Sequence, residues 1–158
     1  MKMNELGRTG ISVSEFCLGS MTWGSQNSAE EGHEQIDRAL DAGLWFEKTE
    51  RREDVILATK HSGEGMAAVR DGAPISSQTI AETIEGSLRR LKTDYIDLYQ
   101  FHWPNRGSYM FRKNWTYDPS GQLLLDTVSH MEDALEALEK EVKRGTIRSF
   151  GLSNESAW

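Results

Sequence analysis

The chain has 158 residues, the length of one domain, and its 37% hydrophobic and 27% charged residues are typical of a soluble globular protein. Its 25 acidic and 18 basic side chains give a formal charge of −7, which argues against a nucleic-acid partner because like charges repel. No run approaches the roughly 20 apolar residues of a membrane span, and the first residues lack the apolar core of a signal peptide. We therefore expect a cytoplasmic protein without a membrane partner, folded as one domain over residues 1–158.

The N-terminal segment predicts a small hairpin over residues 3–14, because Gly7 and Gly10 separate short apolar positions. The next apolar tract, Phe16–Ser20, predicts a short strand, in which Gly19 permits close approach by a neighbour or a ligand. Cys17 is the only cysteine, so the chain has no internal disulfide, and we expect a buried, reduced thiol.

The first helix has a clear start, because Ser28 and Glu31 have the spacing of a capping box. Its apolar face is spaced i, i+3, i+4 and i+7 and ends at a glycine, which is a natural helix stop; these positions are Ile36, Ala39, Leu40 and Gly43. Residues 47–54 are almost wholly charged and indicate the end of a polar-faced helix. They leave no room for a full buried strand before Val55, where an alternating fold would place one.

The rest of the chain alternates strands with amphipathic helices, which indicates a parallel sheet with right-handed crossovers. The predicted strands are Val55–Lys60, Tyr95–Phe101 and Ile147–Ser153. The predicted helix faces are Ile80, Ile84, Leu88 and Leu91, then Val128, Met131, Leu135, Leu138 and Val142. Four strands, counting Phe16–Ser20, are fewer than the eight of a closed (β/α)8 barrel, so we expect an open sheet or part of a barrel.

Two strands end in side chains that can carry chemistry, Lys60 and His102. Active sites of parallel α/β folds lie at this end of the strands. Lys60 is interpreted either as a lysine that tunes the pKa of a neighbour or as a solvated strand end. His102 either polarises a carbonyl or is held by a backbone partner. Ser153 and Asn154 follow the last strand and either hold a polar ligand group or cap a turn.

Other polar and aromatic features have simpler interpretations. Asp97, in mid-strand, is expected to bind backbone or a lysine. The loop glycines Gly63 and Gly65 lack the third glycine of a phosphate-binding fingerprint, and the four histidines show no metal-ligand spacing. The long loop Trp103–Gln122 is rich in aromatic residues and predicts a substrate-lining lid or a contact surface.

Several motifs, in order, resemble the aldo-keto reductase superfamily, most closely its potassium-channel β-subunit-like branch. They are LGRTG at 6–10, CLGSMTWG at 17–24, LATK at 57–60, SLRRL at 87–91, TDYIDLYQFHW at 93–103 and GTIR with FGLSNE at 145–155. The resemblance implies a partial (β/α)8 barrel with an N-terminal β-hairpin and about four or five of the eight parallel strands. It also implies hydride transfer from NADPH to a small aldehyde or ketone.

The resemblance assigns roles to individual residues. It implies that Lys60 is the lysine that lowers the pKa of a proton-donating tyrosine, and that His102 orients the substrate carbonyl. Ser153 and Asn154 correspond to the pair that holds the nicotinamide carboxamide. Gly19, Ser20 and Met21 correspond to the turn beside the cofactor. No metal is implied.

The sequence departs from the family pattern in two places. The second strand with its aspartate, and the loop with its tyrosine, are missing between Gly43 and Val55, and no tyrosine precedes Tyr95. Glu47 replaces the aspartate only if residues 44–46 form a strand remnant, which we do not favour. Compared with the family, the chain also ends after the fifth strand, so we expect an internally deleted and C-terminally truncated reductase that lacks activity.

Three alternatives follow from these departures. The chain is a truncated, inactive carbonyl reductase with weak or lost cofactor binding, a non-catalytic module whose open sheet edges pair with another copy or a complementary fragment, or a decayed fragment. Exposed strand edges favour pairing between chains. The sequence does not separate the last two alternatives.

Overall fold

The computed structural model describes residues 2–42, 52–106, 115–118 and 120–155. The chain divides into two compact units, residues 1–56 and 57–158. In the first unit, β1 (Met3–Glu5) and β2 (Ser12–Ser14) form the predicted antiparallel hairpin, with Met3 opposite Ser14. The sequence prediction is confirmed here because the two glycines supply the left-handed backbone that the turn requires: Gly7 and Gly10 have φ values of 59° and 71°.

The predicted strand at Phe16–Ser20 is wrong, since the structure has irregular backbone there. Within the described part of the first unit these residues form no ladder with a neighbour, and a strand without a neighbour leaves its backbone groups unpaired. The prediction of a buried thiol fails for the same reason. Cys17 is exposed in this irregular segment.

Helix α1 (Ala29–Asp41) begins as the sequence predicts. The Ser28 N–H donates to Glu31 Oε2 at 2.8 Å and the Glu31 N–H donates to Ser28 Oγ at 3.2 Å, which completes the capping box. Ala39 and Gly32 are buried, and Gly32 lies beside the ring of Trp23, where an added Cβ would be at an ordinary contact distance of 3.7 Å. Gly43 and the interval to residue 51, including Glu47, lie outside the described residues. A 3₁₀ turn, η1 (Arg52–Asp54), follows.

The second unit contains a three-stranded parallel sheet in the order β3 (Ala58–His61), β4 (Ile96–Phe101), β5 (Ile147–Leu152). The sequence predicted all three strands. The first begins later than predicted, since Val55–Leu57 lie before β3, and it includes His61 after Lys60. The parallel sheet therefore has three strands among the described residues, one fewer than the predicted four, because Phe16–Ser20 does not join it.

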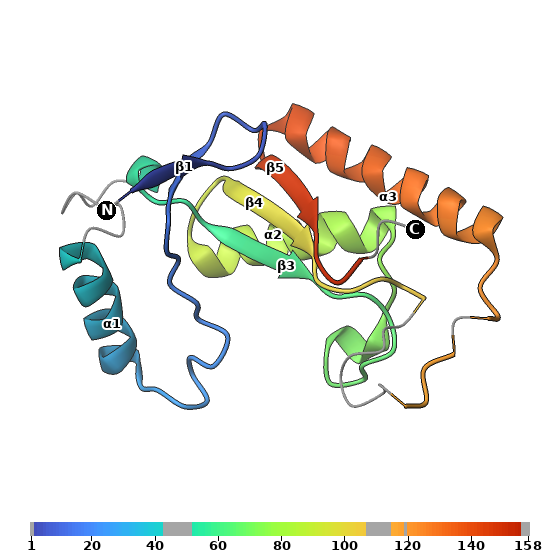
Figure 1. The fold of residues 1–158 in the computed structure, drawn as a ribbon, viewed down its shortest axis with the longest axis horizontal. Coiled ribbons are helices and arrows are strands. Elements are labelled where there is room, and N and C mark those ends of the chain that lie inside the picture. Colours follow the sequence, from blue (N-terminus) through green and yellow to red (C-terminus); the bar gives the residue numbers. More distant parts are fainter. Residues whose placement is uncertain (1, 43–51, 107–114, 119, 156–158) are drawn as a thin grey trace. The chain divides into compact units, whose positions relative to one another are not determined.

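Helices α2 (Ser77–Leu91) and α3 (Leu124–Arg144) pack with the sheet around one core, and Figure 1 shows them in the second unit beside β3, β4 and β5. The core unites one face of each helix with the Tyr99 and Phe101 side chains of β4. Its helical members are Ile80, Ile84, Leu88, Ala134, Ala137 and Leu138. This arrangement of strands alternating with helices is the predicted partial α/β barrel.

The predicted apolar face of α3 is rotated slightly from the one that is buried. Val128 and Val142 are 42% and 37% exposed, whereas Ala134 and Ala137 are buried. Leu138 of the predicted face is buried in the same core and Leu135 packs against it, so the two alanines extend the predicted face rather than replace it. The helix ends as predicted, at Gly145 with φ of 81°.

The loop that follows β4 is described only in part. Tyr109 and Phe111, two of the aromatic residues of the predicted lid, lie outside the described residues. Trp115 is 98% exposed, and the Tyr117 hydroxyl accepts a hydrogen bond from Gln122 Nε2 at 2.8 Å. A lid or contact surface at this loop therefore stays a prediction. Among the helices described, none is long and apolar enough to cross a membrane.

Candidate functional site at the carboxyl ends of the parallel strands

The sheet register brings the predicted catalytic side chains to one face and one end of the sheet. Lys60 pairs with Gln100, and Gln100 pairs with Gly151. Paired residues of parallel strands point to the same side, and side chains alternate along each strand. His102 and Ser153 therefore follow on the same face as Lys60, one pleat beyond the Gln100 row. Tyr99 and Phe101 point to the opposite face, into the helical core.

The backbone of His102 is fixed from both sides. Its N–H donates to the His61 carbonyl oxygen at 2.8 Å, which ties it to β3. Its carbonyl oxygen accepts a hydrogen bond from Asn154 Nδ2 at 2.6 Å, which ties it to the segment after β5. The Ser153 N–H donates to the Phe101 carbonyl oxygen at 2.8 Å, so the ladder continues to this point. The imidazole is thus carried by a rigid backbone at the end of the sheet.

Lys60 and His102 interact electrostatically. The pKa of His102 is lowered from its ordinary value, first by burial of the ring and then by the positive charge of Lys60. A lowered histidine pKa means that the ring is uncharged at neutral pH and can donate one N–H to a carbonyl oxygen. The exposed Lys60 ammonium adds positive charge beside it. Together the two groups can polarise a carbonyl and stabilise negative charge that develops on its oxygen.

Asn154 has the left-handed backbone that asparagine tolerates, with φ of 58°. Its Nδ2 also contacts Ser153 Oγ at 3.1 Å. These bonds use the amide nitrogen of Asn154 and leave its Oδ1 as an acceptor, while the Ser153 hydroxyl retains a proton to donate. A primary carboxamide presents one donor and one acceptor group, so this pair fits the nicotinamide end of the implied cofactor.

The remaining predicted cofactor residues belong to the first unit. Gly19, Ser20 and Met21 lie in irregular, exposed backbone, and the Met21 side chain is 89% exposed. Ser20 accepts a backbone hydrogen bond from the Trp23 N–H at 3.1 Å, which forms a turn. Their role beside a cofactor stays a prediction.

The described tyrosines are partnered elsewhere. The Tyr99 hydroxyl contacts His61 Nδ1 at 2.9 Å and Thr83 Oγ1 at 2.6 Å on the helix side of the sheet. Burial raises the pKa of Tyr99 to about 12. Tyr117 binds Gln122, and the ring of Tyr95 lies 4.5 Å from the Arg148 guanidinium carbon. Within the described part of the chain, no tyrosine is shown to bind Lys60.

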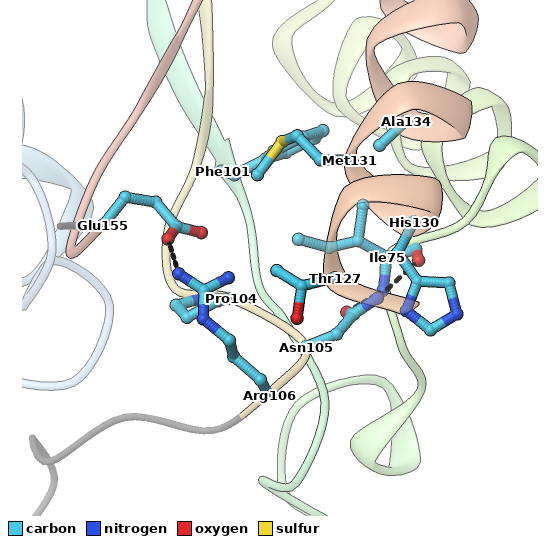
Figure 2. Close-up of a pocket in the computed structure, with 10 residues that line it drawn as sticks. All are labelled: Ile75, Phe101, Pro104, Asn105, Arg106, Thr127, His130, Met131, Ala134 and Glu155. Atoms are coloured by element: carbon cyan, nitrogen blue, oxygen red, sulfur yellow. Dashed lines mark hydrogen bonds and ion pairs between the residues drawn. The ribbon is translucent and has the colours of Figure 1, made fainter. Parts of the chain in front are cut away.

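A small cavity lies on the helix side of the same strand ends, and Figure 2 shows the side chains that line it. Its volume is about 50 Å³, well below the roughly 300–1,000 Å³ of ordinary ligand pockets. Three of its polar side chains already have partners. Arg106 pairs with Glu155, and the Asn105 side chain binds both backbone groups of Ile75, at 2.6 and 2.8 Å. The cavity is therefore a packing feature rather than a cofactor site.

The structure also adds residues to the sequence interpretation. Gln100 lies between Lys60 and Gly151, on the face of the sheet that carries Lys60. Its place in the sequence, as a polar residue two positions before His102 in an apolar strand, is the signal that indicates this position. Asp97 has a structural role, as predicted, because its carboxylate accepts from the Leu57 N–H and from Arg148, both at 3.0 Å. The charged partner is an arginine rather than the predicted lysine.

Comparisons of sequence and structure find similar known proteins. The model of the aldo/keto reductase family matches residues 42–158. Protein tas of Escherichia coli is 32% identical over the whole chain, which covers 53% of that protein. The uncharacterized oxidoreductase YrpG of Bacillus subtilis is 31% identical over the whole chain and 51% of its own length. The holo form of the aldo-keto reductase AKR11C1 from Bacillus halodurans superposes with a TM-score of 0.70 at 27% identity, covering 97% of this chain and 50% of that one.

The alignments also show that this chain is shorter than its relatives. It spans about half the length of the curated relatives it matches. The alignment with protein tas has 191 positions, and the chain supplies 158 residues, so at least 33 positions (191 minus 158) face no residue of this chain. The relative therefore has residues within the aligned region that this chain lacks. The chain belongs to the aldo/keto reductase family, in its potassium-channel β-subunit-like branch, and it is a partial form of that family's (β/α)8 barrel.

Proposed function

We propose that the carboxyl ends of β3, β4 and β5 bind the nicotinamide end of NADPH beside a small aldehyde or ketone. Ser153 and Asn154 hold the carboxamide through one donor and one acceptor. Lys60 and His102 lie next to the carbonyl oxygen of the substrate and polarise it. The observation that supports this proposal is the register: Lys60 pairs with Gln100 and Gln100 with Gly151, and His102 and Ser153 come two residues after Gln100 and Gly151.

When bound, the cofactor supplies the hydride. The chain's own residues orient the carbonyl and stabilise the negative charge that forms on its oxygen. That oxygen also needs a proton donor, and none of the described tyrosines binds Lys60. A general acid contributes about 10²–10⁴ in rate, so we expect binding without appreciable turnover.

A fluorescence titration of NADPH tests the binding. Asn154→Ala removes the amide and also frees the His102 carbonyl, so we expect the dissociation constant to rise by about tenfold, as for loss of 1.4 kcal/mol. Leu125→Ala, at an exposed position of α3, is the matched control and leaves the titration unchanged. Absence of binding, or equal binding by the Asn154→Ala variant, contradicts the proposal. Consumption of NADPH with nitrobenzaldehyde well above that of His102→Ala shows instead that the chain is an active enzyme.

We also propose that residues 1–158 form one partial domain rather than two independent ones. The family match starts at residue 42, within the first unit, and continues through the second. One cooperative unfolding transition in denaturant, with the same midpoint for Trp fluorescence and circular dichroism, is expected. Two separated transitions contradict this.

A second candidate function is assembly through the sheet edges. Among the described residues β4 lies between β3 and β5, and neither outer strand has a second neighbour in this sheet. A second copy of the chain supplies strands of the same kind. Leu152→Lys places a charge at the 47%-exposed end of β5, and Leu125→Lys places one on α3 as a control. Light scattering measures the mass of the three proteins. A wild-type oligomer that Leu152→Lys dissociates and Leu125→Lys does not favours assembly, and a strictly monomeric wild type argues against it.

A further inference from the structure

The loop after β3 lies directly on the backbone that follows His102. A Cβ atom at Gly63 would overlap the carbonyl oxygens of Trp103 and Pro104, so only glycine permits this approach. Next to it, Trp103 Nε1 donates to the Glu64 carbonyl oxygen at 3.2 Å. Two adjacent contacts thus join the β3 and β4 loops, and the Trp103 side chain is 4% exposed.

The ring that these contacts hold lies against His102. The centres of the His102 and Trp103 rings are 4.8 Å apart, and their planes are tilted by 48°. The backbone of His102 is already fixed by His61 and Asn154, so the remaining freedom of its side chain is rotation of the imidazole. A fixed indole restricts that rotation on one side.

We propose that Gly63 is a positioning residue for His102, acting through Trp103. By lacking a side chain, Gly63 lets its loop press Trp103 against the imidazole and exclude water from that side. This inference rests on the proposed function of His102, but the contacts themselves do not depend on a bound cofactor.

The test is a proton NMR titration of His102 in the intact chain, with its signal assigned by its loss in His102→Gln. In Gly63→Ala the loop moves off Trp103 and water reaches the imidazole. Burial is the main cause of the lowered pKa of His102, with Lys60 as the charged neighbour, so the midpoint shifts upward toward the ordinary value of about 6.5. Trp103→Phe keeps an aromatic ring but loses the bond to Glu64, and its midpoint shifts in the same direction.

Gly121→Ala is the matched control, because Gly121 has open space where its Cβ would lie, and its His102 midpoint stays at the wild-type value. If Gly63→Ala does not fold, Trp103→Phe decides. An unchanged His102 midpoint in the folded variants, with only a lower unfolding midpoint, overturns the positioning role. A shifted midpoint in a chain that binds no NADPH supports the positioning role and instead overturns the proposed cofactor function.

Discussion

Asn154 donates a hydrogen bond from Nδ2 to the carbonyl oxygen of His102 at 2.6 Å. The residue expected to hold a cofactor thus also fixes the backbone of the residue expected to polarise the substrate. Since His102 is bonded to β3 through His61 as well, the three strand ends form one connected edge. A substitution that displaces one of these strand ends should therefore displace the other two as well.

Replacing Lys60 by methionine should raise the pKa of His102. Removing a neighbouring positive charge stabilises the protonated imidazole, because one of the two causes that lower its pKa is lost. An NMR titration of His102 measures this upward shift. Lys140→Met, on the exposed face of α3, controls for the change in net charge. Equal His102 titrations in wild type and Lys60→Met would show that the two groups do not interact.

The stability of the chain should fall as the pH falls from about 6.5 toward 3, in part because of His61. Burial, followed by the charge of Arg70, lowers the pKa of His61 to about 3, whereas the unfolded chain has the ordinary value of about 6.5. Between these values the unfolded state takes up a proton that the folded state does not. His61 therefore costs about 1.4 kcal/mol per pH unit in this window, or about 3 kcal/mol from pH 6.5 to pH 4.

Urea unfolding at several pH values tests this prediction. His61→Gln should flatten the dependence by about that amount, although loss of contacts with Tyr99 and Thr83 lowers its stability at neutral pH. His130→Gln, at an exposed position of α3, should keep the wild-type slope. If the unfolding free energy of both variants changes with pH as in wild type, the pKa of His61 is not lowered by burial.

Substitution of Asp71 by glycine should stabilise the protein. Arg70, Asp71 and Gly72 are three consecutive residues with left-handed backbone, at φ of 51°, 55° and 76°. A non-glycine residue there costs about 1–2 kcal/mol, and glycine loses about 0.5–1 kcal/mol of chain entropy on folding, so the net gain is about 0–1.5 kcal/mol.

Arg70→Gly is the informative comparison, because it relieves the same backbone strain. Its guanidinium binds the carbonyl oxygens of Ser62 and Ala73, so we expect this variant to be less stable than wild type. Thermal unfolding compares the two variants. A destabilised Asp71→Gly variant would contradict the assignment of strain to this turn.

Asp97→Ala should lower the free energy of unfolding by about 2 kcal/mol, since it removes the buried carboxylate that pairs with the half-exposed Arg148 and leaves the Leu57 N–H without this acceptor. Asp97 is fully buried and binds both Leu57 and Arg148, which join the beginnings of β3 and β5. Asp94→Ala, at an exposed position, should change stability by less than about 0.5 kcal/mol. If urea unfolding shows a similar loss of unfolding free energy for both variants, Asp97 does not have this structural role.

Local signals in the sequence were sufficient for much of the fold. The Ser28–Glu31 capping box marks the start of α1, and Gly145 marks the end of α3. Both signals act within one helical turn, so the helix ends can be predicted without knowledge of distant contacts. The apolar runs of β3 and β4 likewise predict that Lys60 and His102 lie near strand ends, whereas the pairing of these two strands joins residues 40 positions apart.

Features that depend on distant partners could not be predicted. Phe16–Ser20 has the composition of a strand but no neighbour to pair with among the described residues of its unit. The close approach of Gly63 to Trp103 joins residues 40 positions apart, and nothing in the local sequence distinguishes Gly63 from the other loop glycines. The bond from Asn154 to His102 likewise spans 52 positions.

The most direct test of the account is a residue-resolved NMR map of the amide shifts that NADPH causes in the intact chain. We predict that the changes concentrate at the carboxyl ends of β3, β4 and β5, at Lys60, His102, Ser153 and Asn154, and that ADP-ribose, which lacks the nicotinamide, does not reproduce them. Changes confined to other parts of the chain, or the same map with ADP-ribose, would contradict it.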